Sequence, residues 1–168
     1  GKSATPVRLN AERLRGTFSG SGISGTFGGA DAIIGTVPVA LDKADGRWRM
    51  YRGDLTVNGN ATAYDRTDLP RFYPLRSNDL AFRLNDTGHI RPTGTLVHPA
   101  SGTRVTDVTI AHDLDTGIGS ALLDVRGITF GANLQPDELT RLTEGIIALV
   151  QGTVSGRGRI DWNGSGKV

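Results

Sequence analysis

The chain has 168 residues, about the length of one domain, and it contains no cysteine, which excludes disulfides, cysteine zinc sites and cysteine nucleophiles. Nineteen basic and 17 acidic residues give a net charge of +2, too small for a general nucleic-acid-binding protein. The 24 glycines and 7 prolines together stay below the ~25–30% of residues typical of disordered sequence, so we predict a folded, glycine-rich domain.

No apolar run approaches the roughly 18 residues that cross a membrane as a helix, and the N-terminus has no apolar signal-peptide core. We interpret residues 1–5 as an edge left by cloning, with which a targeting segment could have been removed.

Alternation of apolar and polar residues with a period of two predicts short β-strands along the first half of the chain. It is clearest in residues 53–63, where Leu55 and Val57 lie on one side and Thr56 and Asn58 on the other. Two prolines around an aromatic pair predict an irregular loop over residues 65–77. Shorter alternating stretches lie near residues 14–18, 23–27, 37–41 and 48–50, with turn signals at 44–46 and 58–59.

The second half continues in the same way, with one exception. Residues 150–163 alternate as a strand, with Ile160 and Trp162 on one face and Arg157 and Arg159 on the other. Pro136, followed by acidic residues and by apolar residues at helical spacing, predicts one short helix of two to three turns near 136–145. Further strands are predicted at 80–84, 108–114 and 121–125, with turn signals at 85–88, 100–102 and 115–117.

Strands joined by short turns predict an all-β fold with an antiparallel meander as its topology. Each predicted strand has one apolar face only. Such a sheet must curve on itself, pack against a second sheet as a β-sandwich, or cover its apolar face with something else, and lipid is one such cover. We expect residues 1–168 to form a single β-rich segment.

Motifs for catalysis or cofactor binding are weak. Residues 20–25 match G-x-G-x-x-G, but no helix is predicted after them, so two strands with a glycine turn are favoured over a dinucleotide site. His112 and Asp113 would point to opposite faces of a strand, which disfavours a metal site at 112–115. We therefore predict no enzyme activity and no catalytic, cofactor-binding or metal-binding residues.

Residues 47–52 (RWRMYR) combine cations with aromatic rings and are the best candidate for a nucleic-acid contact. Alternation divides them, with Arg47, Arg49 and Tyr51 on one face and Trp48 and Met50 on the other. A solvated strand face with an inward tryptophan is the favoured interpretation, so no nucleic-acid partner is predicted.

The second half of the chain resembles a known family. The resemblance is carried by residues 94–99 (GTLVHP), 105–114 (VTDVTIAHDL), 119–125 (GSALLDV), 134–150 (LQPDELTRLTEGIIALV) and 152–162 (GTVSGRGRIDW). Together they are similar to the YdbH proteins of Gram-negative bacteria, relatives of the AsmA-like and TamB proteins. The stretch from Pro136 to Trp162 is the most specific part of the match.

This resemblance implies a segment of a long periplasmic protein that is anchored in the inner membrane. It implies a curved, taco-like or U-shaped sheet whose apolar inner face conducts phospholipids towards the outer membrane. The implied partners are phospholipid acyl chains, neighbouring β-segments of the full-length chain, and a small outer-membrane lipoprotein that would add a β-strand.

The residues and the resemblance agree on one hypothesis, a groove for acyl chains that needs apolar area and no catalytic group. The alternative is a non-enzymatic structural or interaction β-domain of a bacterial envelope protein. The candidate groove residues are Leu55, Val57, Leu80, Phe82, Leu84, Val108, Ile110, Val150, Val154, Ile160 and Trp162.

Overall fold

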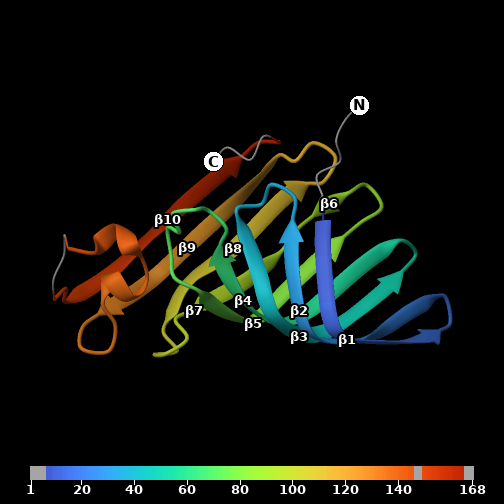
Figure 1. Ribbon diagram of the computed structural model, residues 1–168, viewed down its shortest axis with the longest axis horizontal. Helices are drawn as coiled ribbons and strands as arrows, with labels where there is room; N and C mark the ends of the chain where they lie inside the picture. The colour runs from blue at the N-terminus through green and yellow to red at the C-terminus, as the bar shows by residue number, and fades with distance from the viewer. Residues whose placement is uncertain (1–6, 146–148, 165–168) are drawn as a thin grey trace.

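The structure is a computed structural model that describes residues 7–145 and 149–164. Within these residues the chain forms ten β-strands and two short 3-10 helices, with no α-helix (Figure 1). The strands are β1 (Val7–Ser19), β2 (Gly22–Ile34), β3 (Val39–Tyr51), β4 (Asp54–Asp65), β5 (Leu75–Leu84), β6 (His89–Ile90), β7 (Thr93–Val97), β8 (Arg104–Asp113), β9 (Gly119–Phe130) and β10 (Gly152–Trp162).

All ten strands belong to one sheet in which neighbours in sequence are neighbours in space. The order runs from β1 through β5 to β8, β9 and β10, and the short strands β6 and β7 both lie between β5 and β8. Every pairing is antiparallel. The predicted all-β antiparallel meander is confirmed, and residues 66–74 join β4 to β5 as a loop.

The helix expected near 136–145 is replaced by two single 3-10 turns, η1 (Pro136–Glu138) and η2 (Arg141–Thr143). Pro136 does stand at the start of η1, which has a capping box between Gln135 and Glu138. A longer helix is interrupted at Thr140, whose backbone is extended with φ −151° and ψ 141°. The Thr140 hydroxyl donates a hydrogen bond to the Arg71 carbonyl, so a contact with a distant loop prevails over local helix propensity.

Two predicted turns, at 44–46 and 58–59, lie instead inside β3 and β4. Gly46 is paired with Gly59 in the sheet, and a Cβ atom on Gly46 would lie 2.2 Å from the Asn58 carbonyl oxygen. Glycine is needed there because two strands approach closely and not because the chain turns. The β3–β4 turn is made by Arg52 and Gly53, both with positive φ, as a two-residue hairpin requires.

The strand register gathers the apolar residues on one side of the sheet, which we call the apolar face. Side chains that are paired across strands point to the same side. Bulges in β2, β3, β5 and β9 change the spacing along these strands without moving their apolar residues to the other side. One row of paired residues on this face crosses the whole sheet: Phe18, Ile23, Met50, Leu55, Leu84, Ile90, His112, Gly119 and Trp162.

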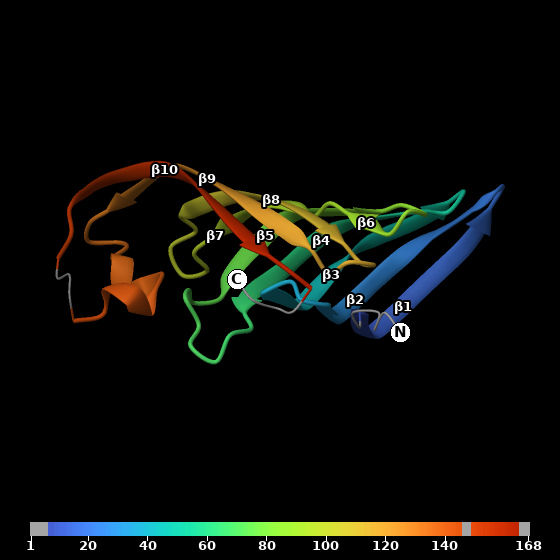
Figure 2. The same ribbon diagram turned by 90° about the horizontal axis from the view of Figure 1, so that it is seen from above.

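The sheet is curved, with the apolar face inside (Figure 2). Val37, in the turn between β2 and β3, packs in one buried cluster with Ala121 of β9 and Trp162 of β10. The Thr36 hydroxyl in the same turn donates a 2.7 Å hydrogen bond to the Gly117 carbonyl. These strands are far apart in the sheet order, so they can meet only because the sheet coils. We call this contact of residues 35–38 with β8–β10 the clasp.

A second cluster covers the apolar face where β5, β7 and β9 lie close to the 66–74 loop. Leu134 and Leu139, from the segment that contains η1, are buried against Leu75, Ile128 and Phe130 of the sheet. The loop and this segment are joined by backbone, since Tyr73 N donates a 2.9 Å hydrogen bond to the Leu139 carbonyl. We call this the end cluster.

Candidate functional site: the apolar face

The eleven candidate groove residues lie on the apolar face, but in three different surroundings. Ile110, Ile160 and Trp162 take part in the clasp, and Val150 packs in the end cluster. Val154 on the edge strand β10 is exposed, with 52% of its surface accessible. The remaining candidates are half-buried on the central strands: Leu55, Val57, Leu80, Phe82, Leu84 and Val108.

The central part of the face is continuous between β4 and β5. Leu55 is paired with Leu84 and Val57 with Phe82, so the four side chains form two neighbouring rows of the antiparallel pair. All four remain partly accessible. This arrangement offers a surface of apolar side chains to a molecule inside the curve of the sheet.

Residues of β1–β3 extend the same face and were missed by the sequence-based set. Phe18 is paired with Ile23 and is 81% exposed, and Met50, paired with Ile23 from the other side, is 43% exposed. The sequence signal for Met50 was its alternation with arginines in residues 47–52, and the signal for Phe18 was the short alternating stretch at residues 14–18.

Two tryptophans lie across the apolar face above glycines of neighbouring strands. A Cβ atom on Gly16 would lie 2.8 Å from Trp48 Cζ2, and one on Gly119 would lie 2.5 Å from Trp162 Cζ2. The indole N–H of Trp48 donates to the Arg15 carbonyl at 3.1 Å. Because glycine leaves room for each ring, the indoles can lie close to the sheet while their N–H groups are satisfied within the protein.

His112 lies on the apolar face and is 3% exposed. Its Nδ1 accepts a 3.1 Å hydrogen bond from the indole N–H of Trp162, so the neutral ring carries its proton on Nε2. Nε2 is buried and has no hydrogen-bond partner. Burial lowers the pKa of His112, although the nearby Asp113 carboxylate acts in the opposite direction.

We expect acid to destabilise the protein through His112. Its pKa is lower in the folded protein than the ordinary value of 6.5, so the unfolded chain binds the proton first as the pH falls. The free energy of unfolding should be level above pH 7 and fall as the pH drops below 6.5. His112→Asn should remove this part of the pH profile, measured by urea unfolding between pH 5 and 8. An unchanged profile in the variant would assign the effect to other groups.

The Asp113 carboxylate next to His112 holds the turn between β8 and β9. The Asp113 carboxylate accepts hydrogen bonds from the backbone N–H groups of Asp115 and Thr116, both at 2.9 Å. No group of three or more His, Cys, Asp or Glu side chains with the geometry of a metal site occurs among the described residues. The β1–β2 connection at Gly20 and Ser21 is a hairpin turn, so the G-x-G-x-x-G string of residues 20–25 lies in this turn and the start of β2.

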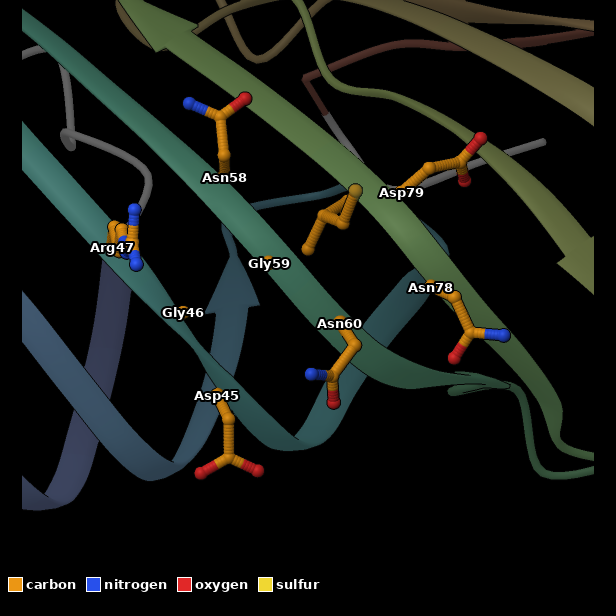
Figure 3. Close-up of a pocket in the computed structure, with 9 residues that line it drawn as sticks. Asp45, Gly46, Arg47, Asn58, Gly59, Asn60, Asn78 and Asp79 are labelled. Carbon is orange, nitrogen blue, oxygen red and sulfur yellow. The ribbon is translucent and has the colours of Figure 1, made fainter.

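The opposite, outer face of the sheet is polar. Its open depression over β3–β5 surrounds Gly46 and Gly59, and Figure 3 shows the side chains of Asn58, Asn60 and Asp79 at its rim. Nearby on β8 and β9, the Asp107 carboxylate pairs with the guanidinium groups of two arginines, Arg104 and Arg126. The sheet is therefore amphipathic, with an apolar inner face and a predominantly polar outer face.

Comparison with known protein families matches residues 2–168 to the YdbH-like family, described as intermembrane phospholipid transport protein YdbH. No curated protein and no solved structure matches the chain. Within the part of the chain that the structure describes, no helix is long and apolar enough to span a membrane. The chain belongs to the YdbH-like family of intermembrane phospholipid transport proteins, which are lipid transporters and not enzymes, as the resemblance of its second half predicted.

Proposed function

We propose that the apolar face binds the acyl chains of phospholipids, and that the chain is one segment of a bridge along which these lipids move between the inner and outer membranes. Family membership implies phospholipid transport in the envelope or periplasm. The observation that supports acyl-chain binding is the amphipathic sheet, which curves around its apolar face. Leu55, Val57 and Phe82 at the centre of this face remain accessible.

The energetics favour acyl chains as the occupants of this face. Each methylene that leaves water gains ~0.8 kcal/mol, so about ten methylenes along the face would gain ~8 kcal/mol without any polar anchor. Acyl chains need little directional bonding, and the apolar face provides area and few polar groups. The buried His112 packs against Trp162 of the clasp and already accepts a hydrogen bond from it.

The two edges of the sheet support continuation into further β-segments. β1 and β10 each have a neighbour on one side only, and nearly all their residues are exposed. An unpaired strand edge presents free N–H and C=O groups that another strand can pair with. We propose that neighbouring segments of a longer, inner-membrane-anchored periplasmic protein occupy these edges, and that a small outer-membrane lipoprotein can add a strand to one of them.

A structural β-domain of the envelope is the second candidate function. It is favoured by the clasp and the end cluster, in which protein side chains cover part of the apolar face. A domain that fills its own concave side in this way could serve as a spacer without binding lipid.

Site-specific photo-crosslinking distinguishes the two candidates. A photoreactive amino acid at Val57 or Phe82, on the apolar face, should capture phospholipid when the protein is expressed in bacterial cells. The neighbouring outer-face positions Thr56 and Arg83 are the matched controls, since each is adjacent in sequence and points to the opposite side. Equal labelling at all four positions, or no labelling of folded protein, would reject the lipid groove in favour of the structural domain.

A further inference from the structure

The β1–β2 and β3–β4 turns lie side by side at one end of the sheet (Figures 1 and 2). The outer face of the sheet at this end is rich in arginine. Thr26 of β2 is paired with Arg15 of β1 on one side and with Arg47 of β3 on the other. Arg49, paired with Ser24, lies closer to the turns on the same face. Arg52 lies in the β3–β4 turn itself. None of these four arginines forms an ion pair with another residue that the structure describes.

The acidic residues near this end leave the basic charge in excess. Asp54 is already paired with Arg83 at 2.6 Å. Asp86 lies near the β3–β4 turn, where its Cβ atom would be 3.8 Å from a Cβ atom added to Gly53. The unpaired arginines therefore give this corner of the outer face a positive potential.

An aromatic residue and exposed apolar residues lie at the same end. The Tyr51 ring has the guanidinium groups of Arg49 and Arg52 each 5.2 Å from its centre. On the other side of the sheet, Phe18 is 81% and Met50 43% exposed. Arginine and tyrosine next to exposed apolar side chains is the combination that lies at membrane–water interfaces.

We propose that this end of the sheet docks on an anionic phospholipid bilayer, with the four arginines at the headgroups and Phe18 and Met50 reaching the acyl region. A nucleic acid would use the arginines and Tyr51 but would give no role to apolar side chains on the opposite face. Docking goes beyond the proposed lipid groove and does not depend on it. If both hold, the row of apolar residues that begins at Phe18 opens directly onto the bilayer.

The test is co-sedimentation of the purified chain with vesicles of phosphatidylcholine alone or of phosphatidylcholine with 30% phosphatidylglycerol. We expect binding to the anionic vesicles only, weakened by salt. Because a basic residue near an anionic surface contributes roughly fivefold in affinity, Arg49→Glu should lower the partition coefficient about tenfold or more. Phe18→Ser should lower it on anionic vesicles as well, without changing its dependence on salt.

Arg8→Glu is the matched control, since Arg8 is exposed on the outer face of β1, away from the turns, and has no ion-pair partner among the described residues. Arg8→Glu changes the net charge by the same amount as Arg49→Glu and should alter the partition coefficient on anionic vesicles less than twofold. The docking proposal would be overturned if both variants lost the same vesicle affinity, or if the unmodified chain bound neutral and anionic vesicles equally. Binding to single-stranded DNA that Arg49→Glu abolishes while vesicle binding persists would overturn it too. Lipid crosslinking at Val57 with no vesicle docking would reject the docking and leave the groove standing.

Discussion

Replacing Trp162 by alanine should cost about 3–5 kcal/mol of unfolding free energy, the range for deleting a buried aromatic side chain. Trp162 is 3% exposed and lies at the centre of the clasp, where it packs with Val37 of the β2–β3 turn and Ala121 of β9. Alanine would leave a cavity over Gly119 and would also remove the N–H donor to His112 Nδ1. The loss should therefore exceed that of a purely apolar truncation.

A second variant separates packing from hydrogen bonding. Trp162→Phe keeps most of the ring but removes the indole N–H, and should cost about 1–3 kcal/mol because His112 is left without its donor in a buried place. Both variants are compared by urea unfolding at pH 7.5, where His112 is neutral. If alanine and phenylalanine cost the same, the hydrogen bond and not the packing of the clasp dominates.

The clasp also defines what the sequence could and could not predict. Alternation is a local property, so it could assign Leu55 and Val57 to one side of their own strand and Phe82 and Leu84 to one side of theirs. It could not predict that Leu55 pairs with Leu84 and Val57 with Phe82 in the sheet. The contact of Val37 with Trp162 depends on how ten strands coil together, and the twist of a large sheet is not written in any one strand. The sequence therefore predicted an apolar face, but not which part of it would be covered.

Glycine and proline signals were ambiguous for a physical reason. Gly46 and Gly59 resemble turn residues in sequence, yet they serve the close approach of β3 and β4. Pro136 marked the start of η1, but Thr140 ended the helical run because its hydroxyl bonds to the distant Arg71 carbonyl. Both errors arose where a contact between distant segments determined the local conformation.

Removing the Asp65 carboxylate should lower the unfolding free energy about as much as Trp162→Ala, because this carboxylate holds the loop that supports the end cluster. Its side chain is fully buried and accepts hydrogen bonds from Thr67 N at 3.0 Å, Arg71 N at 2.9 Å and Arg71 Nε at 2.7 Å. Asp65→Ala would leave these donors unsatisfied and the Arg71 guanidinium without its partner. Breaking such a pair costs about 3–5 kcal/mol.

The pH dependence of this group provides an independent check. Burial alone would raise the pKa of Asp65, but the Arg71 guanidinium and the backbone N–H groups outweigh it and lower the pKa to about 2. Because the folded pKa lies below the ordinary value of 3.8, the stabilisation is complete above pH 3.8 and is lost as the pH falls towards 2. A shift of that size corresponds to roughly 2 kcal/mol, which Asp65→Asn should lose at neutral pH.

The consequence for the apolar face follows from how the loop is attached. The Arg71 carbonyl accepts a hydrogen bond from the Thr140 hydroxyl, and Tyr73 N donates one to the Leu139 carbonyl. Loosening residues 66–74 should therefore also loosen the segment that covers Leu75 and Phe130. Hydrogen exchange of the Tyr73 amide should therefore accelerate in Asp65→Ala more than exchange in β3. Asp68→Ala, an exposed carboxylate in the same loop, should change stability by less than about 0.5 kcal/mol. If Asp68→Ala is as destabilising as Asp65→Ala, the loop is sensitive to any change of charge and the buried ion pair is not its anchor.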